Sequence, residues 1–356
     1  MTHRPDARSG RRKALWMTAT LMVAAALPAL AQDPGKAARD LAMYQGADRQ
    51  ERLLELAKKE GDLNVYHVYP ALPAVMAAFT KKYGIKVKAW RAGSEAVLQR
   101  VMAETRGGRH EVDIVQNNAP ENEAAFREKL LQELGSPHLK DLMPAAVPAH
   151  RHWAGITLDV WTAGYNTNLV KKEDLPRSYQ DLLDPRWKGK LAIEGNNHIW
   201  FNSLLTELGE ESGRRLFENI VATNGITVRK GHSVLTNLVA SGDIPMALTV
   251  YSWIPEQLKK KGAPVENWAI QPLLAQPSTI AVLKRAPNPA AALLFVDFML
   301  GEGQKLLADA SFVPTSRLLP SPLGTLQIKL IDPARALDQN EKWEKTFDEM
   351  ILKKAK

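Results

Sequence analysis

The chain has 356 residues, with 47 lysine and arginine residues against 39 aspartate and glutamate residues, and it has no cysteine. The absence of cysteine excludes disulfides, thiol catalysis and thiolate metal sites. The formal net charge is +8, but residues 1–31 hold five basic residues and one acidic residue, so residues 32–356 carry only the remaining +4. This weak basic excess argues against a nucleic-acid partner.

The first 31 residues have the order of a secretory signal peptide. Basic side chains cluster before residue 14, an apolar run covers residues 14–30, and the small-x-small pattern of residues 29–31 resembles a cleavage site before Gln32. A transmembrane anchor is the alternative, but Pro28 and the many alanines make the run short for a span of about 20 residues. We predict a cleaved signal peptide over residues 1–31 and a soluble product in the periplasm. The export route, general secretory or twin-arginine, stays open.

Helices and strands are predicted to alternate in the first third of the chain, from apolar periodicity and glycine stops. In chain order these are a helix over Asp48–Lys59, a strand over Leu63–Tyr66, a helix over Leu72–Tyr83 ended by Gly84, a strand over Ile85–Trp90, a helix capped by Ser94 and ended by Gly107, and a strand over Val112–Gln116. This alternation predicts an open, mostly parallel α/β sheet.

The middle of the chain is richer in tryptophan, threonine, valine and glycine, and Trp153–Asn166 suits strands that cross between two lobes. The remaining predicted elements are strands over Lys190–Ile193, Asp243–Tyr251 and Thr279–Leu283, and helices over Asn202–Leu208, Ser212–Val221, Ser233–Ala240, Glu256–Lys261, Pro289–Leu300 and Glu302–Ala310, followed by an amphipathic tail. Residues 32–356 exceed one ordinary core, so two lobes are expected.

Three segments resemble the extracellular solute-binding proteins of ABC importers, in the branch that includes ferric-binding proteins. The first is Leu63–Tyr66 with Lys82–Val87 and Arg91–Glu95; the second is Gly164–Val170 with Asp174–Pro176, Asp181–Pro185 and Trp187–Lys190; the third is Gly242–Leu248 with Lys260–Pro264 and Ala291–Leu300. They span most of the chain after the signal peptide, in the order that the family has.

The resemblance implies a two-lobed clamshell of the type II periplasmic-binding-protein fold, each lobe a mostly parallel sheet flanked by helices. It implies lobe 1 over residues 32–157, lobe 2 over 158–276, and a return to lobe 1 with C-terminal helices over 277–356. The clamshell closes on a small solute and delivers it to permease subunits of an ABC transporter, without catalysis and without a cofactor. A monomer is expected.

Ferric-binding members place a histidine, a glutamate and a tyrosine pair in the cleft, because hard Fe(III) prefers phenolate and carboxylate oxygens. Read in register with them, this sequence has four residues that are not iron ligands: Pro70, Asn118, Ser252 and Trp253. Tyr69 and Tyr251 lie one position away, so a rearranged site stays open. We therefore predict an organic or oxyanionic solute, with ferric iron and a synergistic anion as the alternative.

Polar and aromatic residues at strand ends and helix starts are the candidates for solute contact, because ligands of open α/β sheets bind beyond the carboxyl ends of the strands. The predicted ligand-binding residues are Tyr66, Tyr69, Ser94, Asn117, Asn118, Asn197, His198, His232, Ser233, Tyr251, Ser252 and Trp253. Backbone N–H groups at the helix starts could also hold an anion. Trp161 and Trp200 are interpreted as core packing.

An enzyme, such as a secreted hydrolase, is the alternative of a different class. The sequence contains no Gly-x-Ser-x-Gly elbow, no His-Glu-x-x-His pair and no Gly-x-x-x-x-Gly-Lys loop. His150 and His152 could bind a metal, but no further ligand is near them in the sequence, so they are interpreted as a solvated loop. No catalytic or metal-ligating residue is predicted.

Overall fold

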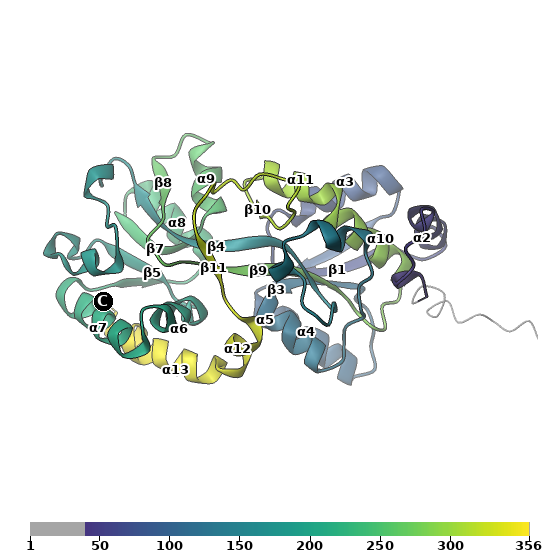
Figure 1. Cartoon of the computed structure of the whole chain (residues 1–356), viewed down its shortest axis with the longest axis horizontal. Coiled ribbons are helices and arrows are strands. Elements are labelled where there is room, and N and C mark those ends of the chain that lie inside the picture. The colour runs from purple at the N-terminus through teal and green to yellow at the C-terminus, as the bar shows by residue number, and fades with distance from the viewer. Residues whose placement is uncertain (1–39, 356) are drawn as a thin grey trace, which may run out of the picture. The chain divides into compact units, whose positions relative to one another are not determined.

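The computed structural model describes residues 40–355. The predicted signal peptide, residues 1–31, lies outside the described residues and stays a prediction. Among the described residues, no helix is both long and apolar enough to cross a bilayer. The described residues belong to one compact unit, which is traced in colour in Figure 1.

A single continuous sheet runs through this unit, with strand order β2-β1-β3-β9-β4-β7-β5-β6. The strands along it are β1 (Leu63–His67), β2 (Val87–Arg91), β3 (Ile114–Asn118), β4 (Ala154–Asn166), β5 (Leu191–Glu194), β6 (Thr227–Arg229), β7 (Met246–Tyr251) and β9 (Leu273–Val282). Three short strands pair off this path: β8 (Val265–Trp268) and β10 (Val313–Pro314) with β4, and β11 (Ile328–Leu330) with β9.

The sheet is parallel at its two outer parts and antiparallel at its centre. Strands β2, β1 and β3 are parallel, as are β6, β5 and β7, whereas β9 and β4 run antiparallel to each other and to their outer neighbours. Strand β4 covers the segment predicted to cross between lobes, and Figure 1 shows β4 and β9 running between the two parts. The crossing segment is thus confirmed as one long strand.

Helices cover both faces of the sheet (Figure 1). They are α2 (Arg49–Ala57), α3 (Leu72–Tyr83), α4 (Ser94–Arg106), α5 (Ala119–Arg127), α6 (His198–Glu207), α7 (Glu210–Asn224), α8 (His232–Ser241), α9 (Trp253–Lys259), α10 (Pro289–Leu300), α11 (Glu302–Asp309), α12 (Pro333–Asp338) and α13 (Asn340–Met350). The predicted bounds of α3 and α10 are confirmed. Gly84 ends α3 with a φ of 75°, in the left-handed region where glycine is favoured.

Local chemistry explains where prediction and structure differ. Ser94 was predicted to cap its helix, but Gly93 is the cap and Ser94 is the first helical residue, its hydroxyl accepting a hydrogen bond from Asn118 Nδ2 at 2.8 Å. Helix α5 was not predicted; it begins directly after β3 with Pro120 in its first turn, which suits a helix start. Strand β9 begins at Leu273 rather than at residue 279, and Pro277 lies inside it, opposite Leu158 of β4.

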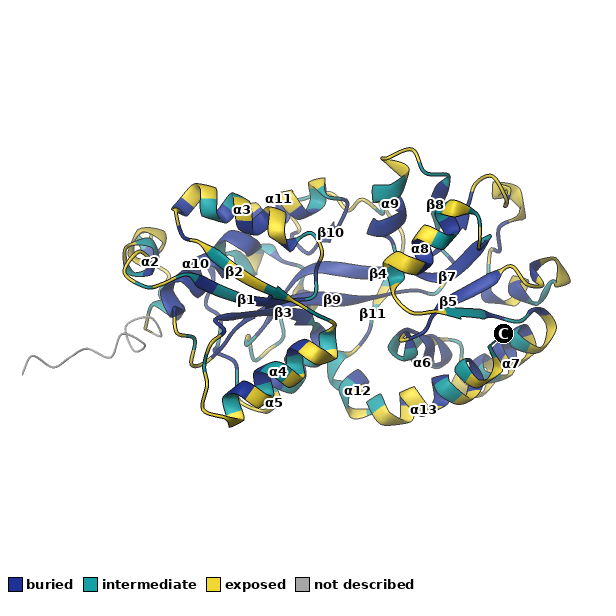
Figure 2. Ribbon diagram, turned by 180° about the vertical axis from the view of Figure 1, so that it is seen from behind, coloured by how far each residue is buried: buried dark blue, intermediate teal, exposed yellow. Residues whose placement is uncertain are grey.

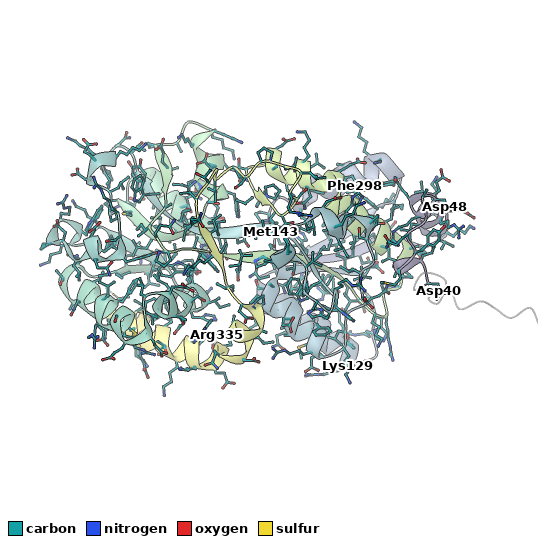
Figure 3. The ribbon with its side chains drawn as sticks, viewed as in Figure 1. Asp40, Asp48, Lys129, Met143, Phe298 and Arg335 are labelled. Carbon is teal, nitrogen blue, oxygen red and sulfur yellow. The ribbon has the colours of Figure 1, made fainter. Side chains whose placement is uncertain are left out.

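Two large apolar cores lie in different parts of the sheet. The first contains Phe79 and Phe295, whose ring centroids are 5.0 Å apart, together with Phe298 of α10, which is labelled in Figure 3. The second contains Phe201 and Phe217, also 5.0 Å apart. Figure 2 shows the central strands in dark blue and the outer faces of α4 and α13 partly in yellow, so the amphipathic helices bury one face each.

The C-terminal helix α13 packs onto the second core. Its Phe347 ring lies 5.5 Å from that of Phe201 on α6, and Trp343 and Met350 belong to the same buried cluster. Helix α12, which carries Arg335 (Figure 3), lies beside α5 of the first part. The tail therefore connects both parts of the sheet on one face.

Candidate functional site

A cavity of about 1050 Å³ lies where the two parts of the sheet meet. Its walls come from the carboxyl ends of β1, β2, β3, β5 and β7 and from the starts of α4, α6, α8 and α9. This is the position at which open α/β sheets bind ligands, because loops and helix starts converge beyond the strand ends. The volume lies at the upper end of the range found for small-molecule sites, up to about 1,000 Å³.

The floor of the cavity is built by the crossing strands. Asp159 and Trp161 are two residues apart on β4, so their side chains point to the same face of the sheet. Their partners across the antiparallel ladders are Gln276 on β9 and Tyr251 on β7, and all four residues line the cavity. The register of three strands therefore places a carboxyl, an amide and two aromatic rings together.

Asp159 is a buried carboxyl, only 1% exposed, with one well-formed donor. The Tyr69 hydroxyl donates to its Oδ1 at 2.6 Å, and the same hydroxyl lies 2.6 Å from Thr157 Oγ1. Burial raises the pKa of Asp159 to about 7, although the Tyr69 hydrogen bond opposes the rise. Burial and the nearby Asp159 carboxyl also raise the pKa values of Tyr69 and Tyr251 well above that of a free phenol.

Glu194 is a second buried carboxyl, at the end of β5, and each of its oxygens accepts a hydrogen bond from a backbone N–H group. Its two oxygens accept N–H groups from Gly231 at 2.8 Å and Asn196 at 2.7 Å. His232 Nε2 lies 3.9 Å from Glu194 Oε2, and the His232 ring lies against Tyr251 with centroids 3.9 Å apart. Burial lowers the pKa of His232, which favours the neutral form of its ring.

Several buried polar atoms at the cavity lack a hydrogen-bond partner within residues 40–355. They are Asn197 Nδ2, His232 Nδ1, Trp253 Nε1, Gln276 Oε1 and Glu121 Oε2; Ser252 Oγ, in the residue before Trp253, also lacks a partner. The other groups of Asn197 and Gln276 are bonded: Trp161 Nε1 donates to Asn197 Oδ1 at 3.1 Å, and Gln276 Nε2 donates to the Tyr251 hydroxyl at 3.2 Å. The open atoms are thus donors and acceptors held in place for a further partner.

Most of the predicted site residues come together at this cavity. Nine of them line it: Tyr69, Ser94, Asn118, Asn197, His198, His232, Ser233, Tyr251 and Trp253. Three do not. Tyr66 lies on the other face of β1, where its hydroxyl donates to Glu104; Asn117 is buried against the backbone of Ser94; and Ser252 is buried beneath the wall.

Asp159, Glu194 and Gln276 line the cavity but are not among the residues predicted from the sequence, and Trp161, interpreted from the sequence as core packing, also lines it. A signal for Asp159 was present, since it interrupts the apolar run Gly155–Trp161 and a carboxylate is costly to bury without a partner. No comparable signal marks Gln276, whose place depends on a strand pairing. The sequence alone does not distinguish Trp161 from a core residue, because it does not show which face of β4 points to the cavity.

The residues in register with the ferric ligands lie at or beside the cavity but do not form a metal site. Pro70, Asn118 and Trp253 line it, and Ser252 precedes Trp253. Within the described part of the chain, no group of three histidine, cysteine, aspartate or glutamate side chains is placed to hold a metal ion. The chemistry of the cavity is that of hydrogen bonds, aromatic faces and buried carboxyls.

Known proteins resemble this chain in sequence. Residues 67–306 match the model of the bacterial extracellular solute-binding proteins. Iron uptake protein A1 of Synechocystis sp. is 25% identical over 281 residues, which are 71% of this chain and 75% of that protein. The putative 2-aminoethylphosphonate-binding periplasmic protein of Salmonella typhimurium is 26% identical over 249 residues, 66% of this chain and 71% of that protein.

A solved structure has the same fold. The crystal structure of iron-bound HitA from Pseudomonas aeruginosa matches with a TM-score of 0.68 at 24% identity, covering 80% of this chain and 98% of that one. This likeness confirms the predicted two-lobed clamshell of the type II periplasmic binding proteins, with helices flanking each part of the sheet.

Proposed function

This chain belongs to the bacterial extracellular solute-binding proteins, and we propose that it is a periplasmic receptor for a small organic solute. It holds the solute in the cavity between its lobes and delivers it chemically unchanged to the permease of an ABC importer. Members of the family bind solutes rather than transform them, and the relatives are named for different cargoes, iron and 2-aminoethylphosphonate. The names of the relatives therefore do not identify the solute of this chain, which depends on the residues of its own cavity.

The observation that carries the proposal is the set of unpartnered polar atoms around the cavity. Trp253 is 5% exposed, Gln276 3% and Asn197 4%, yet each keeps one polar atom without a partner among the described residues. A buried polar group left unsatisfied costs about 1–3 kcal/mol. A solute that supplies the missing partners recovers this free energy on binding.

We propose lobe 1 over residues 32–157, lobe 2 over 158–276, and a return to lobe 1 plus C-terminal helices over 277–356, of which α13 packs on lobe 2. Strands β4 and β9 pass from one lobe to the other, so a small change in their twist would alter the opening of the cavity. Closure around a bound solute would bring α4 and α5 of one lobe toward α6 and α8 of the other.

Catalysis finds no support in the cavity. Ser252 Oγ, a possible nucleophile, has no base within hydrogen-bond distance among residues 40–355. Both Glu194 oxygens are taken by backbone N–H groups, which leaves them unsuited to remove a proton from a substrate. A receptor that releases its solute unchanged fits these contacts better than a hydrolase does.

Ferric iron is the second candidate, since Tyr69 and Tyr251 both line the cavity and relatives are named for iron. An iron site here would require both phenols to ionise beside Asp159. Burial and that carboxyl oppose their ionisation, as the direction of both pKa shifts indicates. An organic solute makes no such demand.

Thermal unfolding of the protein, expressed as the full chain and purified from the periplasm, tests the proposal. A library of small organic solutes and ferric citrate is added in separate wells, because a ligand that binds only the folded state raises the midpoint. We expect a shift with an organic solute, accompanied by a change in tryptophan fluorescence from Trp161 and Trp253. A visible tyrosinate-to-iron absorption band with ferric citrate would instead support the iron candidate.

Two controls accompany this measurement. Trp187→Phe changes a buried tryptophan that is not part of the cavity and should leave the fluorescence response to solute intact, whereas Trp161→Phe should reduce it. The intact mass of the purified protein also tests the signal peptide: loss of residues 1–31 is expected, and a retained N-terminus would contradict that prediction.

A further inference from the structure

The cavity is acidic although the chain as a whole is basic. Its charged lining has one arginine, Arg91, and no lysine among the residues described, against six carboxyls: Glu95, Glu121, Asp159, Glu194, Glu344 and Asp348. The full chain carries a net charge of +8, so composition does not explain this excess. A cleft lined by one sign of charge attracts solutes of the opposite sign.

Helix starts would ordinarily favour an anion in the same place, because their free N–H groups carry partial positive charge. Here the chain's own carboxyls stand at these starts. Glu95 is in the first turn of α4, Glu121 is in the first turn of α5, and Glu194 accepts the N–H of Gly231 directly before α8. The starts of α4, α5 and α8 are therefore already supplied with carboxyls, whereas the first turn of α6 contains no acidic residue.

Asp159 is the carboxyl best placed to contact a solute. It lies on the floor of the cavity and forms no ion pair with a lysine or arginine within residues 40–355; its one well-formed donor is the Tyr69 hydroxyl. The indole N–H of Trp253 lies near it but does not reach hydrogen-bond geometry. A buried carboxylate is normally paired with a cation or several donors, and Asp159 has neither.

Aromatic faces surround this carboxyl. Trp161 and Tyr251 form one ring pair with centroids 6.0 Å apart, and Tyr69 and Trp253 form another at 6.3 Å. Aromatic faces attract organic cations through their negative quadrupole. The unpartnered Oε1 of Gln276, across the ladder from Asp159, is an acceptor that a donor group of the solute can use.

We infer that the solute carries a protonated amine, whose ammonium group pairs with Asp159, donates to Gln276 Oε1 and lies among the rings of Trp161, Tyr251 and Trp253. This inference rests on the proposed receptor function and names the class of its cargo. An amine is favoured over a metal ion because the described residues provide no set of three clustered histidine, cysteine, aspartate or glutamate side chains, and burial opposes ionisation of Tyr69 and Tyr251.

The titratable and charged groups that line the cavity with Asp159 come from several elements. Tyr69 follows β1, Arg91 ends β2, Glu121 lies on α5, Glu194 ends β5, His232 begins α8 and Tyr251 ends β7. Arg91 is exposed and its guanidinium donates to the carbonyl of Val68 at 3.1 Å. Ionisation of Asp159 near pH 7, where an alkylamine stays protonated, should therefore strengthen amine binding as the pH rises.

The test uses three sets of compounds that match in size and differ in charge: 1-aminobutane and 1,4-diaminobutane, 1-butanol and 1,4-butanediol, and butyrate and succinate. Thermal unfolding and calorimetry are measured at pH 8 for the natural protein, Asp159→Asn and Glu173→Gln. The asparagine keeps the acceptor for Tyr69, and Glu173 is an exposed carboxyl outside the cavity.

We expect the amines to raise the unfolding temperature more than their matched alcohols and acids do. Asp159→Asn should weaken amine binding at least about tenfold, because a charge-assisted contact is lost, and Glu173→Gln should not change it. Amine binding that survives Asp159→Asn unchanged would overturn the role of Asp159. Should that variant not fold, the natural protein's affinity still tests the inference, since it should rise between pH 6 and pH 8.

The failure of this inference differs from the failure of the receptor proposal. Stabilisation by an acid or an alcohol, with none by an amine, would overturn the amine and leave a receptor for another solute. Stabilisation by none of the three sets, nor by any compound of the broader library, would contradict both.

Discussion

Two buried aspartates, one at the base of the first lobe and one in the cavity, differ in how the chain satisfies them. Asp113 accepts hydrogen bonds from the backbone N–H groups of Asn64 at 2.8 Å and Asn288 at 2.6 Å, and from Asn288 Nδ2 at 3.1 Å. Asp159 is equally buried and has the Tyr69 hydroxyl alone as a well-formed donor. The first carboxyl joins β1, β3 and the start of α10, whereas the second faces a cavity with unpartnered groups around it. The number of donors, and not burial, therefore separates a structural carboxyl from one available to a solute.

The largest expected effect is the loss of stability in Asp113→Asn. The asparagine NH₂ group would replace a carboxyl oxygen that now accepts hydrogen bonds. It would then face the N–H groups that donate to that oxygen, and two donors cannot form a hydrogen bond with each other. We expect the free energy of unfolding to fall by about 2–4 kcal/mol, measured by urea denaturation. The affinity of the folded variant for an amine should not change. If Asp113→Asn lost amine affinity but not stability, the proposed difference between the two aspartates would be wrong.

Asp159→Asn should have the opposite effect on stability. The pKa of Asp159, about 7 in the folded state, is above the usual aspartate value, so its ionisation disfavours folding progressively between about pH 4 and pH 7. The unsolvated charge is absent in the variant, and the solute-free variant should be more stable than the natural protein at pH 8 by roughly 1–3 kcal/mol. The gain should shrink toward pH 5 in denaturation curves recorded at both values. A loss of stability at pH 8 would show that Asp159, like Asp113, stabilises the folded protein.

Amine affinity should follow the ionisation of Asp159. With a pKa of about 7, the ionised fraction rises nearly tenfold between pH 6 and pH 8, so the association constant should rise by up to about tenfold. Calorimetry with 1,4-diaminobutane at the two pH values measures this. Burial lowers the pKa of His232 and raises that of Glu121 to about 7, so the same measurement is made on Asp159→Asn, in which the rise that Asp159 causes should be absent. A flat profile would show that Asp159 is not the partner of the amine.

The smallest expected effect is that of Tyr251→Phe. This change removes the hydroxyl that accepts from Gln276 Nε2 at 3.2 Å and leaves the ring in place. We expect amine binding to weaken by about 0.5–1.5 kcal/mol and stability to change less. Tyr165→Phe is the matched control: its hydroxyl donates to Glu266 at 3.0 Å, outside the cavity, and its loss should leave binding unchanged. Equal effects of the two changes on binding would contradict a direct role for Tyr251.

Much of the local structure was determined by the sequence itself. The apolar period of residues 72–83, followed by Gly84, specified α3 and its end, because glycine adopts the left-handed conformation at little cost. Strand ends and helix starts such as Tyr69, Asn197 and His232 could be selected as site residues because in α/β sheets these positions converge at one edge. These features depend on residues that are close together in the sequence, so they can be predicted from it.

The floor of the cavity was decided by the tertiary structure. Strand β4 is buried along its whole length, so no alternation of polar and apolar residues reveals which face Asp159 and Trp161 point to. Gln276 is 117 positions away from Asp159 and joins it only through the antiparallel register of β4 and β9. The sequence by itself determined helices such as α3 and α10, the crossing strand and the edge at which a solute would bind. The pairing of distant strands, which depends on long-range packing, decided that this edge holds a buried carboxyl.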